Sequence, residues 1–355
     1  MTTHSRRETL SRRRFAALGG GGLVAGLAGC LGEGDAADAD GGEPSSDGDD
    51  DEDADGPVVV ASFFTFYDFA RKIAADTPVT VENLVPVGMH GHGWEPDPTI
   101  TRDVIDADAF VHVGEDFQPW ADRTIQTVRD DDADTSLIDA REGIELLPLA
   151  ESLEEDEAVG DGEDPHFWLD PSLAKQAVDN VAAGLVDVAP DHESTLSENA
   201  EGLRTELEAL DSEWQEVFDA AERDVVFLAA HNAFEYVGER YGVTVNPLVE
   251  NLAASDDVKP RDRRRARETI DEHDIRYIGA AVFESRRPAR QLRSDTPVEA
   301  YFPVTPYAGI TEEWVERDWG YFEIARNINV PTFEILTGAV DPDDTSLGDE
   351  WRNFE

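Results

Sequence analysis

The stretch that decides the fold is DPSLAKQAVDNVAAGLVDVAPDH, Asp170 to His192, which opens a helical region reaching Ala221. Asp170 is a good N-cap and Pro171 suits the first helical position, so a helix is predicted to begin here. The sequence APDH, at residues 189–192, predicts a break into two helices. Because strand-like segments lie on both sides of this region, we expect two lobes connected by helix.

Eight short apolar runs lie around the helical region, four before it and four after it, and most are separated by helical patterns. Continuous apolar runs of this kind are typical of parallel strands in sheets that helices cover on both faces. The runs are Pro57–Ser62, Val79–Val85, Ala109–Gly114, Thr135–Ala140, Asp224–Ala230, Val243–Val249, Arg276–Phe283 and Val298–Val304. The expected fold class is α/β, with two lobes that each contain a mostly parallel sheet flanked by helices.

Residues 1–30 have the parts of an export signal: a basic head, an uncharged middle and small residues at the end. The uncharged run, 15–29, is shorter than the ~20 residues that span a membrane. SRRRFA, from Ser11, resembles a twin-arginine export box, and LAGC resembles a lipobox whose cysteine receives a lipid. Cys30 is the only cysteine, so we expect lipidation there and a metal site, if present, built from His and carboxylate.

The predicted domains follow from these features. They are a signal with lipobox at 1–30, an acidic disordered tether at 31–56, an N-terminal metal-binding lobe at 57–170, a connecting helix at 171–190 and a C-terminal metal-binding lobe at 191–355.

Acidic residues dominate the whole chain, which has 79 Asp and Glu against 29 Lys and Arg and a formal net charge of −50. Only three lysines occur. Such acid-rich, lysine-poor proteins resemble those of salt-adapted, haloarchaeal-like cells, where salt screens the self-repulsion. Nucleic acid is excluded as a partner because no basic face can neutralise its phosphates.

Three histidines follow strands or open loops in both halves: His92 in VPVGMHGHGWEPDP, His166 in DPHFWLDP and His231 in FLAAHNAFEYVGERYGV. Ligands collect at the carboxyl ends of parallel strands, so these histidines are expected to converge on a cleft. Neutral imidazoles suit Zn²⁺, whereas Mg²⁺ and Ca²⁺ prefer oxygen. By contrast, His112 is expected to pack inside a strand, and the two helical histidines, at 192 and 273, to lie on the surface.

The segments PVGMHGHGWEPDPTI, DADAFVHVGEDFQPW, DPHFWLDP and AAHNAFEYVGERYGV resemble, in this order, the cluster A-I solute-binding proteins of ABC importers, which capture zinc or manganese. The resemblance implies a two-lobe fold with a long rigid connecting helix. It also implies that His92 and His166 of the first lobe and His231 of the second are metal ligands.

The fourth ligand departs from that family, which often supplies an Asp after a late strand. Here Thr305 or Tyr307 stands at that place. His90, Glu284 or water could complete the site. The lack of the Asp favours zinc, with manganese as the alternative, and Glu95 or Glu235 could orient the imidazoles.

The resemblance implies binding rather than catalysis: a monomer, held at the outer face of the cell membrane by a lipid, takes up a divalent metal and delivers it to an ABC permease. Two other classes stay open. Three histidines with an open position also occur in zinc hydrolases, although HExxH is absent here, and a surface adhesion protein could use the metal for stability alone.

Overall fold

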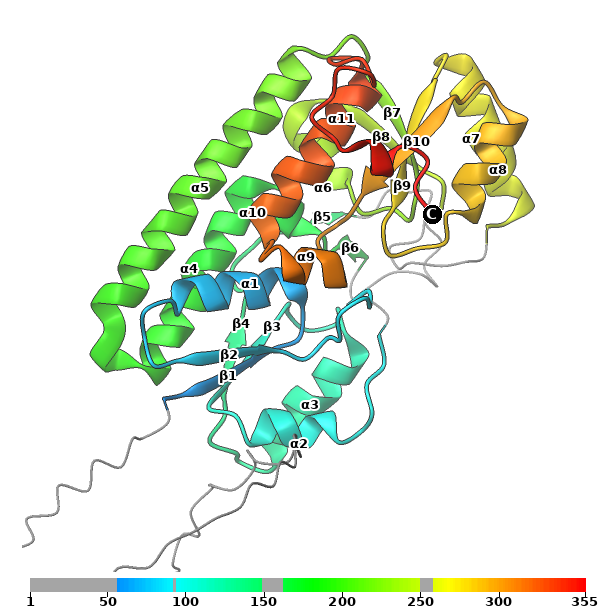
Figure 1. Cartoon of the computed structure of the whole chain (residues 1–355). Coiled ribbons are helices and arrows are strands. Elements are labelled where there is room, and N and C mark those ends of the chain that lie inside the picture. The colour runs from blue at the N-terminus through cyan, green and yellow to red at the C-terminus, as the bar shows by residue number, and fades with distance from the viewer. Residues whose placement is uncertain (1–55, 92–93, 149–161, 250–257) are drawn as a thin grey trace, which may run out of the picture. The chain divides into compact units, whose positions relative to one another are not determined.

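The computed structural model describes residues 56–91, 94–148, 162–249 and 258–355. All eight predicted strands form there, in two four-stranded sheets whose neighbouring strands are all parallel (Figure 1). The first sheet has the order β2-β1-β3-β4, with β1 Val58–Ala61, β2 Thr80–Asn83, β3 Ala109–His112 and β4 Ser136–Asp139. The second has the order β10-β9-β7-β8, with β7 Val225–Ala229, β8 Thr244–Pro247, β9 Tyr277–Ala281 and β10 Ala300–Val304. The predicted α/β class with two sheet-containing lobes is therefore confirmed.

Helices cover both faces of the first sheet, which explains its continuous apolar strands. The four residues of β3 are all buried, as expected for a central strand with helices on each side. A separate apolar cluster that includes Phe110 and Trp120 lies under α2 and α3, while Val59 and Val111 belong to the main core. The helices of this lobe are α1 Phe64–Ile73, α2 Ile100–Ile105 and α3 Pro119–Asp130.

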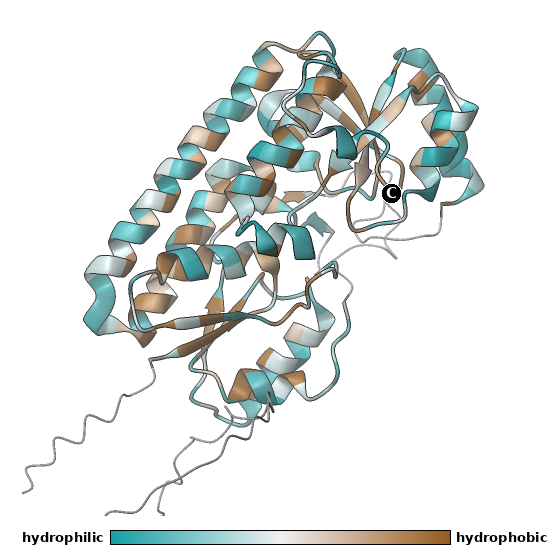
Figure 2. Ribbon diagram, in the orientation of Figure 1, coloured by the Kyte–Doolittle hydropathy of each residue, from teal (hydrophilic) through white to brown (hydrophobic). Residues whose placement is uncertain are grey.

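The second lobe continues the same alternation of strand and helix. Its helices are α6 Glu235–Tyr241, α7 Pro260–Glu272, α8 Arg287–Asp295, α9 Glu312–Glu316, α10 Tyr321–Ile324 and α11 Val330–Thr337, with a π-helical turn at Ala325–Asn329 and a short 3₁₀ turn at Asp349–Trp351. Figure 2 shows the apolar residues concentrated on the strands and on the inward faces of the helices.

Some features were not anticipated. The periodicity of the sequence did not indicate the short antiparallel pair β5 Leu147–Pro148 and β6 Glu163–Asp164, because two-residue strands leave no periodic signal. Helices α9, α10 and α11 were also missed, and each has only four to eight residues.

The predicted helical region contains a 3₁₀ turn at Phe167–Leu169, then α4 Pro171–Val188, a second 3₁₀ turn at Pro190–His192 and α5 Glu193–Asp219. The Asp170 side chain accepts a hydrogen bond from the Ser172 backbone N–H, so the predicted N-cap is observed. The 3₁₀ turn at Pro190–His192 is the predicted break between the two helices. The helix α4 packs against β4 and α1, while α5 contacts α1 in the first lobe and α11 in the second. Both helices thus take part in the connection, and the domain boundaries at residues 170 and 190 stay a prediction.

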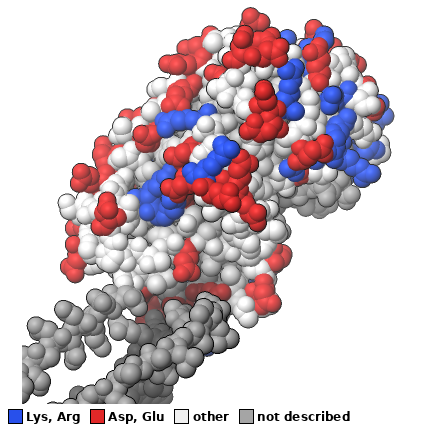
Figure 3. Space-filling model, in the orientation of Figure 1, with Lys and Arg blue, Asp and Glu red and all other residues white. Residues whose placement is uncertain are grey.

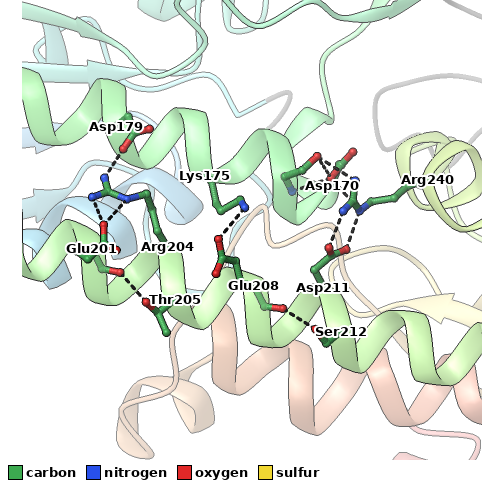
Figure 4. A network of polar contacts seen from close by, with 11 residues as sticks. Asp170, Lys175, Asp179, Glu201, Arg204, Thr205, Glu208, Asp211, Ser212 and Arg240 are labelled. Atoms are coloured by element: carbon green, nitrogen blue, oxygen red, sulfur yellow. Dashed lines mark hydrogen bonds and ion pairs between the residues drawn. The ribbon is translucent and has the colours of Figure 1, made fainter.

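Ion pairs line the contact between α4 and α5 (Figure 4). Lys175 of α4 pairs with Glu208 of α5 at 3.1 Å, and Arg204 of α5 pairs with Asp179 of α4. Arg240 of α6 contacts both Asp211 of α5 and the capping residue of α4. Solvent-accessible pairs such as Lys175–Glu208 contribute little stability singly, but the partly buried pairs of Arg240 connect α6 of the second lobe to the helix pair.

The two lobes share one buried apolar cluster, which includes Phe66 and Trp168 on one side and Trp214 and Tyr321 on the other. A buried carboxylate adds a polar link: Asp68 of α1 accepts the backbone N–H of Tyr321 at 2.8 Å and pairs with Arg71 and Lys72 of its own helix. Moving one lobe against the other would open this core and expose these groups, so the packing favours a single arrangement.

The predicted N-terminal signal, Cys30 and residues 31–55 of the predicted acidic tether lie outside the described residues, so these predictions are not tested by the structure. Within the described residues, no helix is long and apolar enough to cross a membrane.

Candidate metal centre

His231 lies two residues beyond β7, in the loop that leads into α6. Its ring is 1% exposed, and its Nδ1 lies 2.5 Å from Oε1 of Glu284, a residue that follows the neighbouring strand β9. A carboxylate on Nδ1 selects the tautomer that leaves Nε2 as an electron-pair donor. The Nε2 atom of His231 is buried and has no hydrogen-bond partner within the described part of the chain. A buried nitrogen without a partner is a costly arrangement that a bound metal ion would relieve.

His166 precedes the 3₁₀ turn that leads into α4 and is also 1% exposed. Its Nδ1 lies 2.8 Å from Oδ1 of Asp164, and the same oxygen accepts the backbone N–H of His166 at 2.9 Å. Tyr236 of α6 donates a hydrogen bond to the carbonyl of Asp164 and accepts one from the N–H of Leu147. The second lobe therefore helps to hold the loop that carries the histidine of the first.

His90 lies in the loop after β2, next to Gly91. The Gly91 N–H donates to the Ala308 carbonyl of the second lobe, and the Gln118 side-chain amide donates to the Gly91 carbonyl at 3.0 Å. The rings of His90 and His231 are 5.4 Å apart between centroids, and those of His166 and His231 are 5.6 Å apart. Two histidines of the first lobe, His90 and His166, thus lie beside His231 of the second lobe.

His92 lies outside the described residues, so its place in this cluster stays a prediction. Within the described residues, no group of three or more His, Cys, Asp or Glu side chains has the geometry of a complete metal site. The ligand assignments of His90, His166, His231 and Glu284 likewise stay predictions that rest on the distances given above.

Burial favours the uncharged forms of the His166–Asp164 pair. It lowers the pKa of His166 well below its usual range and raises the pKa of Asp164 to about 7. Burial would also raise the pKa of Glu284, but the charge of His231 and its hydrogen bond outweigh this and lower that pKa. His166 therefore stays available as a neutral ligand, and Glu284 supplies a negative charge.

The chemistry of these groups fits a divalent cation. Burying a dication requires nearby negative charge, which Glu284 can provide beside the imidazole nitrogens. Nitrogen together with carboxylate oxygen is a donor set that zinc accepts.

Thr305 and Tyr307, which stand where an Asp was expected, are both engaged in the second lobe. The Thr305 hydroxyl accepts the N–H of Tyr307, and the Tyr307 ring packs against Tyr321 with centroids 4.4 Å apart. Tyr307 has a φ of 55°, and its carbonyl accepts a hydrogen bond from Thr65 of α1. These two residues therefore shape the contact between the lobes.

Glu95 has an exposed carboxylate that pairs with Arg123 at 2.9 Å. Because His92 lies outside the described residues, the role predicted for Glu95 in orienting an imidazole stays a prediction. Glu235 lies in the first turn of α6, and burial raises its pKa. The carboxylates that meet the two Nδ1 atoms are Asp164 and Glu284. Sequence reasoning missed Asp164, although an Asp two residues before a His, as in DPH, is a recognisable signal for a side chain that turns back onto the following backbone.

Two parallel-sheet lobes connected by packed helices, with buried imidazoles from both lobes brought together, define the class of two-lobed α/β binding proteins. The comparisons with known proteins agree with this class. The model of the family "ZnuA: Zinc-uptake complex component A periplasmic" matches residues 59–332. The chain belongs to this family.

Three relatives show the range within it. The high-affinity zinc uptake system protein ZnuA of Bacillus subtilis is 27% identical over 290 residues, covering 80% of this chain and 89% of the relative. The manganese-binding lipoprotein MntA of Halalkalibacterium halodurans is 30% identical over 285 residues, covering 79% and 89%. The zinc-binding lipoprotein AdcA of Streptococcus pneumoniae is 29% identical over 279 residues, covering 76% of this chain and 54% of AdcA.

The crystal structure of Zn(II)-bound AdcA from Streptococcus pneumoniae superposes with a TM-score of 0.67 at 25% identity. The superposition covers 79% of this chain and 58% of that chain, so the chain spans only part of the length of this relative.

Proposed function

We propose that this protein is the extracytoplasmic receptor of an ABC importer, which binds Zn²⁺ between its two lobes and delivers it to a membrane permease. Family membership and the names of the zinc-binding relatives support this proposal. Manganese is the alternative cargo, because MntA carries that name at similar identity.

One observation carries the proposal. His166 and His231 come from different lobes, lie 5.6 Å apart between ring centroids and each hold a carboxylate on Nδ1. This arrangement presents Nε2 of both rings as donors, and His90, His92 and Glu284 would complete the ligand set. Ligands drawn from both lobes make cargo binding depend on the arrangement of the lobes.

The proposed role is binding without turnover. The cargo competes with protons for the imidazole nitrogens, so metal affinity is expected to fall as the pH falls. Release to the permease would follow from weakening the contacts of one lobe with the ion.

The test compares the full chain with His166→Ala and His231→Ala, and with His273→Ala as a control at an exposed histidine. We expect one Zn²⁺ per chain by elemental analysis for the parent and the control, and loss of stoichiometric zinc from both site variants. Competition with Mn²⁺ identifies the cargo. Retention of zinc by both site variants would refute the proposed centre.

We also propose export through the twin-arginine route and anchoring by a lipid on Cys30, supported by SRRRFA and LAGC in the first 30 residues. Replacing Cys30 with Ala is expected to move the protein from the membrane fraction to the medium. An unchanged distribution would contradict the anchor.

The acidic composition supports adaptation to high salt. With a formal net charge of −50, self-repulsion destabilises the folded chain unless salt screens it. The unfolding temperature, followed by circular dichroism, is expected to rise steeply with KCl concentration, and a flat dependence would argue against such adaptation.

A further inference from the structure

A cluster of positive charge stands out in this acidic protein. Residues 258–295, which include α7 and α8, contain 11 of the 29 Lys and Arg residues of the chain and only seven acids. Figure 3 shows Lys and Arg gathered on the flank formed by these two helices. The local excess of positive charge contrasts with the formal net charge of −50 for the whole chain.

Several of these arginines have no acidic partner among the described residues, although acids outnumber bases more than twofold in the chain. In the described part of the chain, no carboxylate lies within ion-pair distance of Arg264, Arg287 or Arg293, while other arginines of the chain are paired. Exposed arginines left unpaired among so many carboxylates indicate a surface that is kept positive.

A cavity of about 360 Å³ lies between α7 and α8 inside this cluster. Arg263 and Arg267 of α7 line it together with Arg287 of α8. Its volume lies in the range of small-ligand pockets, about 300–1,000 Å³. Three guanidinium groups around one cavity are the arrangement that recognises oxyanions by paired N–H donors.

The charged side chains that line the cavity favour the binding of an anion. Asp295 also lines it, but this carboxylate is paired with Arg267 at 2.5 Å. Arg263 donates a hydrogen bond to the Val258 carbonyl, which orients its guanidinium. Arg287 has no carboxylate within ion-pair distance among the described residues. Among the described lining residues, three arginines and one aspartate give a charge of about +2.

The position of Arg287 at the N-terminus of its helix also indicates a bound anion. Arg287 is the first residue of α8, whose first turn has no acid. Arg263 follows Asp262, which caps α7. Cations are unfavourable at a helix N-terminus, where the helix dipole is positive. A bound anion would satisfy both Arg287 and the dipole of α8, which gives a physical reason for the unfavourable placement of Arg287.

Leu248, just after β8, and Arg287, between β9 and β10, line the cavity, which therefore lies toward the carboxyl ends of these strands, where parallel sheets bind ligands. His166, His231 and Glu284 do not line it. We infer that this cavity is a second binding site of the protein, specific for a phosphate group, supplied either as free phosphate or as the headgroup of an anionic lipid.

The experiment titrates the full chain carrying Cys30→Ser, which prevents an attached lipid from causing vesicle binding, with inorganic phosphate at constant ionic strength held by NaCl. Calorimetry measures the affinity. Arg263→Gln and Arg287→Gln change the cavity, while Arg264→Gln and Arg293→Gln remove the same charge from the same two helices without touching the cavity.

We expect saturable phosphate binding that each cavity variant weakens about tenfold or more, because a hydrogen bond to a charged group is lost. The two control variants are expected to bind like the parent. An equal loss of phosphate affinity in all four variants would show diffuse electrostatic attraction and overturn the site. The same conclusion would follow if chloride at equal ionic strength displaced the bound phosphate. The absence of phosphate binding would also overturn the site.

A second arm identifies the source of the phosphate group. Cosedimentation uses vesicles of phosphatidylcholine, alone or with an equal part of phosphatidic acid. The ligand is a lipid headgroup if the protein binds the acidic vesicles, free phosphate displaces it from them, and the cavity variants do not bind them. If the protein binds free phosphate but no vesicles, the ligand is free phosphate. Binding of poly-glutamate in preference to both would overturn the phosphate assignment in favour of an acidic protein partner. Zinc content is measured in every variant, so failure here is distinguishable from failure of the proposed metal centre.

Discussion

The two buried histidines of the candidate metal centre meet a carboxylate in different ways. Asp164 is two residues from His166 and binds both its backbone N–H and its ring, so the pair forms within one tight turn. Glu284 is 53 residues from His231 and reaches it only because β7 and β9 are neighbours in the second sheet. One lobe therefore orients its histidine by local sequence and the other by tertiary pairing.

This difference has a chemical counterpart. Burial raises the pKa of Asp164 to about 7, so near neutral pH this group is partly protonated and acts chiefly as a hydrogen-bond acceptor. Glu284 keeps its charge beside His231. We therefore expect Asp164 to position its histidine and Glu284 to contribute charge to the metal directly.

The largest loss of stability is expected at the contact between the two lobes. The distance between the two histidine–carboxylate pairs depends on this contact, because it sets the arrangement of the lobes. Asp68→Ala leaves Arg71 and Lys72 without a buried partner and removes the acceptor of the Tyr321 N–H. We expect a loss of about 3 kcal/mol in the free energy of unfolding by denaturant titration. The control is Asp318→Asn, which removes an exposed partner of the same Arg71 and should leave the stability unchanged.

Glu284→Gln tests the charge contribution in the second lobe. Gln retains an oxygen that can accept from His231, so a purely positional role predicts little change, whereas loss of the charge predicts zinc affinity about 10–100-fold weaker. Calorimetric competition with a chelator measures this affinity. Glu239→Gln, at an exposed acid of α6, serves as the matched control and should bind like the parent.

Asp164→Asn tests the positional role in the first lobe. The Asn oxygen can accept both hydrogen bonds from His166, so zinc affinity should fall less than about tenfold. Asp164→Ala removes both hydrogen bonds and should cost about as much as Glu284→Gln. If Asp164→Asn weakens zinc as much as Asp164→Ala, the contrast between the two pairs is wrong and both carboxylates act through their charge.

The smallest expected effect is on the pH dependence of stability and concerns His112. This histidine lies outside the metal centre and is buried, as its position inside a strand predicted. Its Nδ1 accepts the Gly114 N–H, and burial lowers its pKa, so the folded state resists protonation. The unfolded state binds the proton below pH 6.5, so this contribution to stability falls as the pH drops below 6.5.

His112→Asn keeps the acceptor for Gly114 and removes the titration. We expect the decrease in unfolding temperature between pH 7 and pH 5 to be smaller in this variant than in the parent, by differential scanning calorimetry at fixed salt. A steeper decrease in the variant would contradict the assignment.

Much of the architecture could be predicted because it depends on local patterns. Apolar runs of four or five residues, separated by helical periodicity, determine parallel strands, and an Asp-Pro pair begins α4 where expected. The elements that were missed are those without such a pattern: the two-residue strands β5 and β6 and the short helices near the C-terminus.

The sequence alone determined that histidines follow the strands of both lobes, since residues such as His231 are positioned by the strand end that precedes them. Only the tertiary structure decided which carboxylates contact the Nδ1 atoms of these histidines. The pairing of β7 with β9 brings Glu284 to His231, and the shared core, with Tyr236 binding the Asp164 carbonyl, sets the distance between the two rings. Contacts across 53 or more residues depend on how whole sheets pack, and no local pattern of side chains records that packing.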